Sequence, residues 1–182
     1  MRKAVLLSIA LVLLFSALAC GQGPGNAGHA EEPFQVSVWT PLAIRPENVG
    51  ITVFRLNLIY GRNVYIKGLD VGIANHCTGG VSKAWQTGLV SVCEGDFIGW
   101  QDGWAVNYTA GKFLGYQSGF FNDAEDIEGV QMGIINRAGS MSGLQLGFVN
   151  WCDSMYGLQI GLANYIASKE TLPFFVFVNW SF

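Results

Sequence analysis

Charged residues are scarce in this chain of 182 residues. Lys, Arg, Asp and Glu make up 13% of it and hydrophobic residues 51%, whereas ordinary soluble domains are about a quarter charged. This composition argues against disorder and against a soluble enzyme with a heavily charged surface. The net charge of −3 gives no basic surface that suggests nucleic acid as a partner. The length suits a single domain.

Residues that carry catalysis or bind metals are also few. The two histidines, His29 and His76, have no plausible serine or cysteine nucleophile near them in the sequence. The cysteines lack the spacing of a metal site. We therefore expect no enzyme activity and no catalytic, cofactor-binding or metal-binding residue. The four cysteines are Cys20, Cys77, Cys93 and Cys152.

An apolar run near the N-terminus is too short and too early for a convincing membrane span. Arg2 and Lys3 precede it, residues 4–14 form it, and Ala17-Leu18-Ala19 supplies small residues for cleavage. These are the parts of a secretory signal peptide. The sequence predicts a signal peptide over residues 1–19 and an exported chain.

Residues 16–20 resemble a bacterial lipoprotein cleavage box, whose cysteine receives lipid. Ala17 stands where that box usually has leucine. Two alternatives stay open: lipidation at Cys20, or plain cleavage before an incidental cysteine. Residues 20–33 are rich in glycine and polar residues, which predicts a flexible tether. Residues 34–182 are then a single β-repeat domain.

A short phrase, Gly-apolar-Gln-apolar-Gly-apolar-apolar-Asn, recurs along this domain. Glycine lies two residues after the glutamine position in seven of eight units, and Asn57 is the exception. Successive glutamine positions are 15, 16, 15, 16, 14, 14 and 14 residues apart. A short, nearly fixed period in this many copies indicates a repeat architecture. The glutamine positions are Arg55, Asp70, Gln86, Gln101, Gln117, Gln131, Gln145 and Gln159.

Within each unit the hydrophobic pattern has a period of two, which predicts strands. The fold class is all-β, with tandem repeats of about 14 residues and about ten short strands. Residues 34–39 form the first predicted strand, and residues 173–182 form the last. One face of a unit is apolar and the other holds glycine and glutamine: Leu144, Leu146 and Phe148 against Gly143, Gln145 and Gly147.

Two pairings of these strands stay open. In a parallel β-solenoid, glutamine stacks on glutamine, and a position of small residues faces a narrow core. Cys77 and Cys93 would then stack and be able to bridge. In an antiparallel meander, the palindrome Gly-x-Gln-x-Gly also sets like against like, and residues 137–139 form a three-residue hairpin loop. The small residues are Cys77, Cys93, Ala124, Ala138 and Cys152.

The C-terminus favours the meander. Every second residue of the last nine is apolar, and the chain ends on Phe182 with Trp180 two residues before it. This resembles the closing strand of Gram-negative outer-membrane barrels, where such an ending is an assembly signal. We therefore expect an antiparallel meander closed as a small outer-membrane-type β-barrel, with the parallel β-solenoid as the alternative. Thr87, Asp102 and Ser118 fall on its lipid-facing side, and a bulge is expected near Asp102.

Three segments together resemble a family of small exported bacterial surface-repeat proteins: residues 55–63, the Gly-Leu-Gln repeats and the ending at 179–182. The resemblance carries no activity. The predicted function is a non-enzymatic cell-envelope protein, integral to the outer membrane or exposed on the surface of a Gram-negative-type bacterium. Its expected partners are membrane lipid and the outer-membrane assembly machinery. The alternative is a lipid-anchored soluble β-solenoid that acts as a binding module of the periplasm or cell surface.

Overall fold

The computed structural model describes residues 28–182, and these residues form strands and connecting turns without a helix. The predicted signal peptide, the start of the tether and Cys20 lie outside the described residues. The strands are β1 (Glu31–Trp39), β2 (Leu42–Ala43), β3 (Gly50–Asn63), β4 (Lys67–Cys77), β5 (Val81–Cys93), β6 (Asp96–Ile166) and β7 (Phe174–Ser181).

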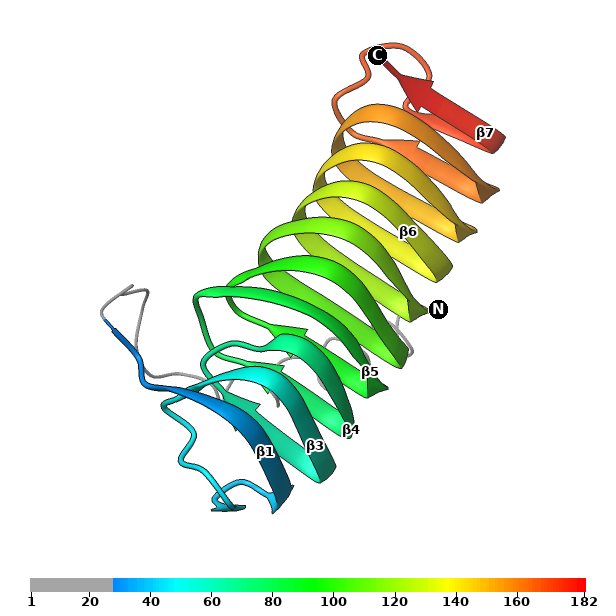
Figure 1. Ribbon diagram of the computed structural model, residues 1–182. Helices are drawn as coiled ribbons and strands as arrows, with labels where there is room; N and C mark the ends of the chain where they lie inside the picture. The colour runs from blue at the N-terminus through cyan, green and yellow to red at the C-terminus, as the bar shows by residue number, and fades with distance from the viewer. Residues whose placement is uncertain (1–27) are drawn as a thin grey trace.

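The chain winds into a parallel β-solenoid (Figure 1). Strands β1, β3, β4, β5 and β6 pair in parallel, each with the next. Strand β6 is one continuous 71-residue segment that forms several stacked coils. The all-β prediction is confirmed, and the predicted barrel is wrong: the alternative solenoid is the fold. Residues 137–139, expected as a hairpin loop, lie inside β6.

The near-constant period explains the parallel stacking, because each coil sets a residue on its counterpart in the next. Gln86 lies opposite both Asp70 and Gln101 in the register. An antiparallel neighbour would also have matched glutamine with glutamine. It would not have set asparagine beside asparagine or small residue beside small residue, because both positions follow the Gly-x-Gln-x-Gly segment and have no counterpart before it.

The interior is narrow and mostly polar. Apolar side chains fill it four residues before the glutamine position, and small residues fill it seven residues after the glutamine position in most coils. The small column confirms the expectation of a narrow core. The two columns include Phe97, Phe113, Ile127, Met141 and Met155, and Cys77, Cys93, Ala124, Ala138 and Cys152, all buried.

Glycine is required at one bend of the coil, two residues before the glutamine position. Gly143 has φ of +136°, a value that L side chains rarely adopt. A Cβ atom there would lie 2.0 Å from the carbonyl oxygen of Gly129 in the preceding coil. Gly115, Gly129 and Gly157 have the same geometry, so this column lets backbones approach closely.

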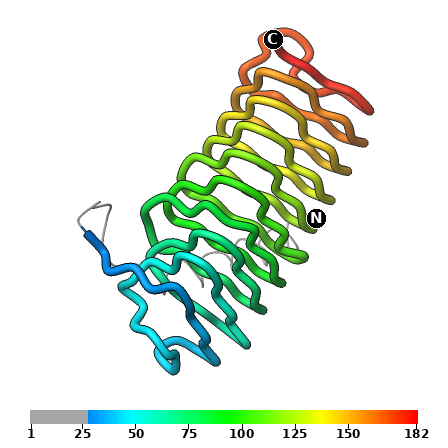
Figure 2. The backbone as a smooth tube through the Cα atoms, viewed as in Figure 1, coloured from blue at the N-terminus to red at the C-terminus, as the bar shows by residue number. Residues whose placement is uncertain are grey.

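The two ends of the solenoid differ (Figure 2). At the C-terminal end, β7 pairs antiparallel with the last coil and places Asn179 opposite Gln159. At the other end, β1 pairs with β3, and β2 turns back on β1. Strand β1 begins at Glu31, three residues before the expected domain start. Among the described residues, no helix is long and apolar enough to cross a bilayer.

Candidate functional site

Two columns of buried amides run along the interior. Each glutamine from Gln101 to Gln159 donates through Nε2 to the Oε1 atom of the glutamine one coil earlier, at 2.7–2.9 Å. Each asparagine from Asn107 to Asn150 donates through Nδ2 to Oδ1 of the asparagine one coil later, at 2.8 Å. Because buried amides need partners, these columns join the coils rather than receive a ligand.

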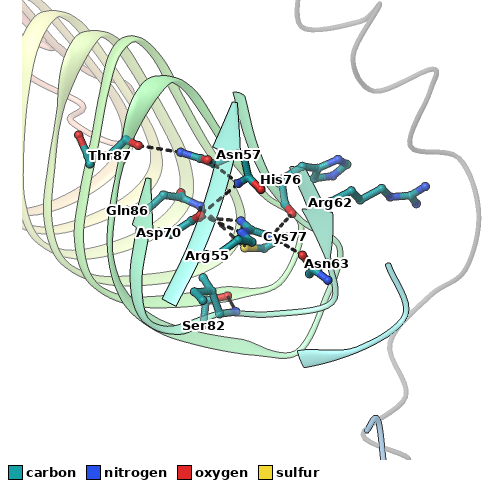
Figure 3. Close-up of polar contacts among 12 residues, drawn as sticks. Arg55, Asn57, Arg62, Asn63, Asp70, His76, Cys77, Ser82, Gln86 and Thr87 are labelled. Carbon is teal, nitrogen blue, oxygen red and sulfur yellow. Dashed lines mark hydrogen bonds and ion pairs between the residues drawn. The ribbon is translucent and has the colours of Figure 1, made fainter. Parts of the chain in front are cut away.

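The glutamine column ends in a buried ion pair (Figure 3). Arg55 donates to both carboxylate oxygens of Asp70, from Nε at 2.8 Å and from Nη2 at 2.6 Å. Gln86 Nε2 donates to Asp70 Oδ2 at 2.7 Å. Both charged side chains are fully buried. The bidentate geometry and the added donor provide the compensation that buried charges require.

The same arginine reaches a thiol. Arg55 Nη2 lies 3.5 Å from Cys77 Sγ, and Nη1 donates to the His76 carbonyl oxygen at 3.1 Å. A hydrogen bond from Cys93 and the nearby guanidinium lower the pKa of Cys77 to about 6, although burial opposes this. The hydrogen bond to Cys77 and burial raise the pKa of Cys93. Burial alone would lower the pKa of Arg55, but Asp70 and Cys77 raise it.

The first coil fills the asparagine column differently. Asn57 takes the place of the usual glycine, lies opposite Gly72 and donates to Asn75 Oδ1 at 2.8 Å. Gly61 lies opposite Asn75, at the position where most later coils have asparagine and one has Ser91. A Cβ atom on Gly61 would lie 1.6 Å from the Asn57 side chain. Asparagine and glycine have therefore exchanged positions, and the amide still occupies the same space.

His76 lies between a phenol and a carboxylate. Its Nδ1 atom is 2.8 Å from the Tyr60 hydroxyl and its Nε2 atom is 2.9 Å from Glu94 Oε1. Burial raises the pKa of Tyr60. These contacts fix the orientation of the imidazole. A serine or cysteine nucleophile is not among the hydrogen-bond partners of this ring in residues 28–182, and the other histidine, His29, is exposed outside the strands.

The outer side of the solenoid carries an exposed apolar face. We use this name for the side chains one residue before, one residue after and three residues after the glutamine position. The predicted division of faces is thus confirmed, with amides inside and large apolar residues outside. The third column is exposed throughout: Leu58, Ile73, Leu89, Trp104, Phe120, Ile134, Phe148 and Leu162.

Polar residues interrupt this face in its middle. Thr87 and Asp102 lie opposite each other, and Ser118 donates through Oγ to Asp102 Oδ1 at 2.7 Å. The expected bulge is present, because the register shifts by one residue after Gly103. It does not move Asp102, which precedes it. Instead it projects Trp104, which is 74% exposed.

The apolar face contains a groove that begins beside this interruption, with Ser118 in its lining, and continues toward the C-terminus. It encloses about 920 Å³ and runs from Trp104 to Phe177 of β7. The floor is the glycine column two residues after the glutamine position. The walls are the two apolar columns on either side, exemplified by Leu146 and Phe148. A smaller hollow of about 400 Å³ continues the line on the far side of Trp104.

The predicted site residues fall on and beside this face. Trp180 lies opposite Leu158 in β7, so it extends the apolar face by one strand. Phe182 is 81% exposed and contacts the Tyr156 ring edge-on at 5.7 Å. Their role as an assembly signal stays a prediction. Cys20 lies outside the described residues.

Sequence reasoning missed the Arg55–Asp70 pair as a unit. The signal was available, because opposite charges occupy the glutamine position in adjacent units, and parallel stacking brings them into contact. The Tyr60–His76–Glu94 contacts had no comparable signal, since these residues lie at unrelated repeat positions. Within the described part of the chain, no group of three or more His, Cys, Asp or Glu side chains could hold a metal ion.

Comparison with known proteins gives no match: no protein-family model, curated protein or solved structure resembles the chain closely enough to be assigned.

Proposed function

We propose that this protein is a non-enzymatic binding module of the bacterial cell envelope that holds the acyl chain of a lipid in the groove of its apolar face. The observation that carries the proposal is the groove itself, bounded by Trp104 and Phe177 and walled by apolar side chains.

The dimensions of the groove suit one extended hydrocarbon chain. Five strand spacings separate Trp104 from Phe177, which is about 24 Å at 4.8 Å per strand. The volume of about 920 Å³ lies within the range of small-molecule sites. The glycine floor leaves the centre of the groove free of side chains, so a chain can lie along the solenoid axis.

The charge distribution supports an apolar ligand segment, such as an acyl chain, inside the groove. The lining contains aromatic, aliphatic and glycine residues with Ser118 and Tyr116 as the polar exceptions, and no charged side chain belongs to it. Acidic and basic pairs such as Asp123–Arg137 and Lys112–Glu128 involve other positions of the coil. A large exposed apolar patch of this kind marks an interaction site in most proteins.

Immersion of the whole face in a bilayer fits less well. Asp102 lies on the face between Thr87 and Ser118, and a carboxylate in hydrocarbon is costly. Asp102 is not part of the groove lining. A single acyl chain in the groove therefore leaves the carboxylate in water, whereas a bilayer over the face does not.

Location and attachment belong to the same proposal. The predicted signal peptide supports export, and lipidation at Cys20 would tether the solenoid to the outer membrane or cell surface. The residues between Cys20 and the start of β1 at Glu31 would then supply the tether to the membrane. Lipid would be available as ligand at either location.

Binding of palmitate tests the proposal. We expect a fluorescent fatty acid to bind the purified chain saturably, and added palmitate to displace it into water. Phe148→Glu puts a carboxylate against the ligand at the centre of the groove, and we expect about tenfold weaker binding. Phe148 is 54% exposed, so the substitution should leave folding intact.

Trp151→Glu is the matched control, since Trp151 is also an exposed aromatic residue but does not line the groove. It should bind palmitate as the unaltered protein does. Equal weakening by both substitutions, or no saturable binding by the unaltered protein, would contradict the proposal. Binding to intact vesicles without binding to palmitate would favour membrane adsorption instead.

A further inference from the structure

Two cysteines meet inside the solenoid at a point that the proposed lipid binding does not use. Cys77 ends β4 and Cys93 ends β5, and the two are directly opposite each other in the parallel register. Both side chains are fully buried and both thiols are free in this structure. Their column is the small-residue column of the core, so both point into the same narrow space.

We propose that Cys77 and Cys93 form a disulfide that joins adjacent coils when the protein folds under oxidising conditions. Directly opposed residues on neighbouring strands have Cα atoms about 4.8 Å apart. Disulfides span Cα separations of about 4.4–6.8 Å. The backbone therefore already holds the two residues within bonding range.

The surroundings also favour this pair of thiols over other pairs. The neighbours of Cys77 and Cys93 along the column are Asn63 and Thr109, which bear no sulfur. Arg55 lies 3.5 Å from the Cys77 sulfur atom, and its positive charge favours the thiolate, which is the nucleophile in disulfide exchange. The Cys93 thiol donates to the Gly95 carbonyl oxygen at 3.4 Å, and the register sets Cys93 directly beside Cys77 in the same buried column.

The reaction is thiol–disulfide exchange with an external disulfide as oxidant. The Cys77 thiolate attacks one sulfur of that disulfide, a mixed disulfide forms, and one thiolate leaves. Cys93 then loses its proton to solvent and attacks the Cys77 sulfur, which releases the second thiolate. Two electrons pass to the external disulfide. Because both residues are buried after folding, exchange takes place while β4 and β5 come together.

Refolding of the full chain in a buffer of reduced and oxidised glutathione tests the proposal. After free thiols are alkylated, a non-reducing digest should contain one cross-linked peptide pair that joins residues 77 and 93. Cys152 occupies the same column several coils away, where its register neighbour is not a cysteine, and it should be recovered alkylated. Recovery of Cys77 and Cys93 as separate alkylated residues, or cross-linked to other cysteines, would overturn the proposal.

Thermal unfolding gives an independent measure. A cross-link that closes a loop of this length should raise the melting temperature by roughly 6–12 °C relative to the reduced protein. Cys93→Ser should melt at the same temperature with and without reductant, and its circular dichroism reports whether it is folded. A redox-dependent shift that persists in this variant would contradict the assignment. Neither the digest nor the melting temperature involves lipid, so failure of the disulfide proposal can be distinguished from failure of the palmitate test.

Discussion

The first coils and the last coils of the solenoid solve the same packing problem with different chemistry. In residues 117–166 the interior is joined by neutral amides, and the coils repeat every 14 residues. In residues 50–93 the coils are 15–16 residues long, and an ion pair, Arg55–Asp70, replaces the first two glutamines. The neutral amides can repeat in every coil because each one can both donate and accept a hydrogen bond. The ion pair occurs where this series of glutamines begins.

The direction of the glutamine column shows why an end is needed. Every glutamine from Gln86 to Gln159 donates toward the N-terminal side, so Gln86, the first of this series, requires an acceptor in the preceding coil that is not a glutamine. The Asp70 carboxylate provides it, and Arg55 balances the charge. At the other end, Gln159 Oε1 finds no hydrogen-bond partner among the described residues. The glutamine column therefore starts at an ion pair and ends at an amide oxygen that accepts no hydrogen bond from residues 28–182.

Removal of the carboxylate should be the most damaging change. Asp70→Asn leaves the buried Arg55 guanidinium without a counter-charge, and breaking a buried pair from one side costs about 3–5 kcal/mol. We expect the free energy of unfolding, measured by urea denaturation, to fall by about that amount.

The double substitution Arg55→Gln with Asp70→Gln extends the amide column of the last coils into the first. It leaves no unpaired charge, so its stability should lie within about 1 kcal/mol of the unaltered protein or above it. If the double variant is as unstable as Asp70→Asn, the ion pair does more than terminate the column, and the comparison between the two regions fails.

An interior amide and a terminal amide should differ by less. Gln131→Leu deprives Gln145 Nε2 of its acceptor and Gln117 Oε1 of its donor. We expect a cost of about 2 kcal/mol, since each unsatisfied buried group costs roughly 1–3 kcal/mol. Gln159→Leu deprives Gln145 Oε1 of its donor but strands no donor in a following glutamine, so it should cost about half as much.

Both variants are compared by urea denaturation under identical conditions. Equal losses would mean that the glutamine column does not act as a chain of directed hydrogen bonds. A larger loss for Gln159→Leu than for Gln131→Leu would show that the contact with β7, rather than the column, dominates at the C-terminal end.

The sequence was sufficient to predict strands, their period and the division of faces. These follow from local alternation, which any side-by-side packing of strands must respect. It was also sufficient to place the small residues of the core at one repeat position. Cys77 and Cys152 show why: the narrow interior favours small side chains at this position, and the preference recurs in most coils.

The direction of pairing was not predictable from the palindromic core of the repeat, and the terminal Phe182 favoured the wrong choice. Direction depends on residues outside the palindrome, above all the asparagines that must stack on one another. The exchange of Asn57 and Gly61 was hidden for a related reason. Alignment by position treats the first unit as divergent, whereas in space its amide fills the same place.

The smallest expected effect concerns pH, which should act on the first coils and leave the amide columns unchanged. The pKa of Cys77 is lowered from 9.0 to about 6, chiefly by the hydrogen bond from Cys93. Between these values the unfolded chain binds more protons than the folded one, so the stability contributed by Cys77 rises with pH and is lost as pH falls through 6. In reduced protein we expect about 1 kcal/mol more stability at pH 8 than at pH 7.

The Cys77→Ser variant isolates this contribution, because it should lose the difference between pH 7 and pH 8. Cys152→Ser is the matched control: burial raises the pKa of Cys152 to about 12, so that thiol stays protonated in the folded chain, and between pH 7 and pH 8 it is still mostly protonated in the unfolded chain. Above pH 9 the raised pKa values of Cys93 and Cys152 reverse the sign, because the folded state then retains protons that the unfolded state has lost. Urea denaturation at pH 7, 8, 9 and 10 should therefore show a maximum near pH 9 in the reduced, unaltered protein. If Cys77→Ser leaves the dependence of stability on pH unchanged, the titrating group is not Cys77. The first coils would then not differ from the last coils in their response to pH through this thiol.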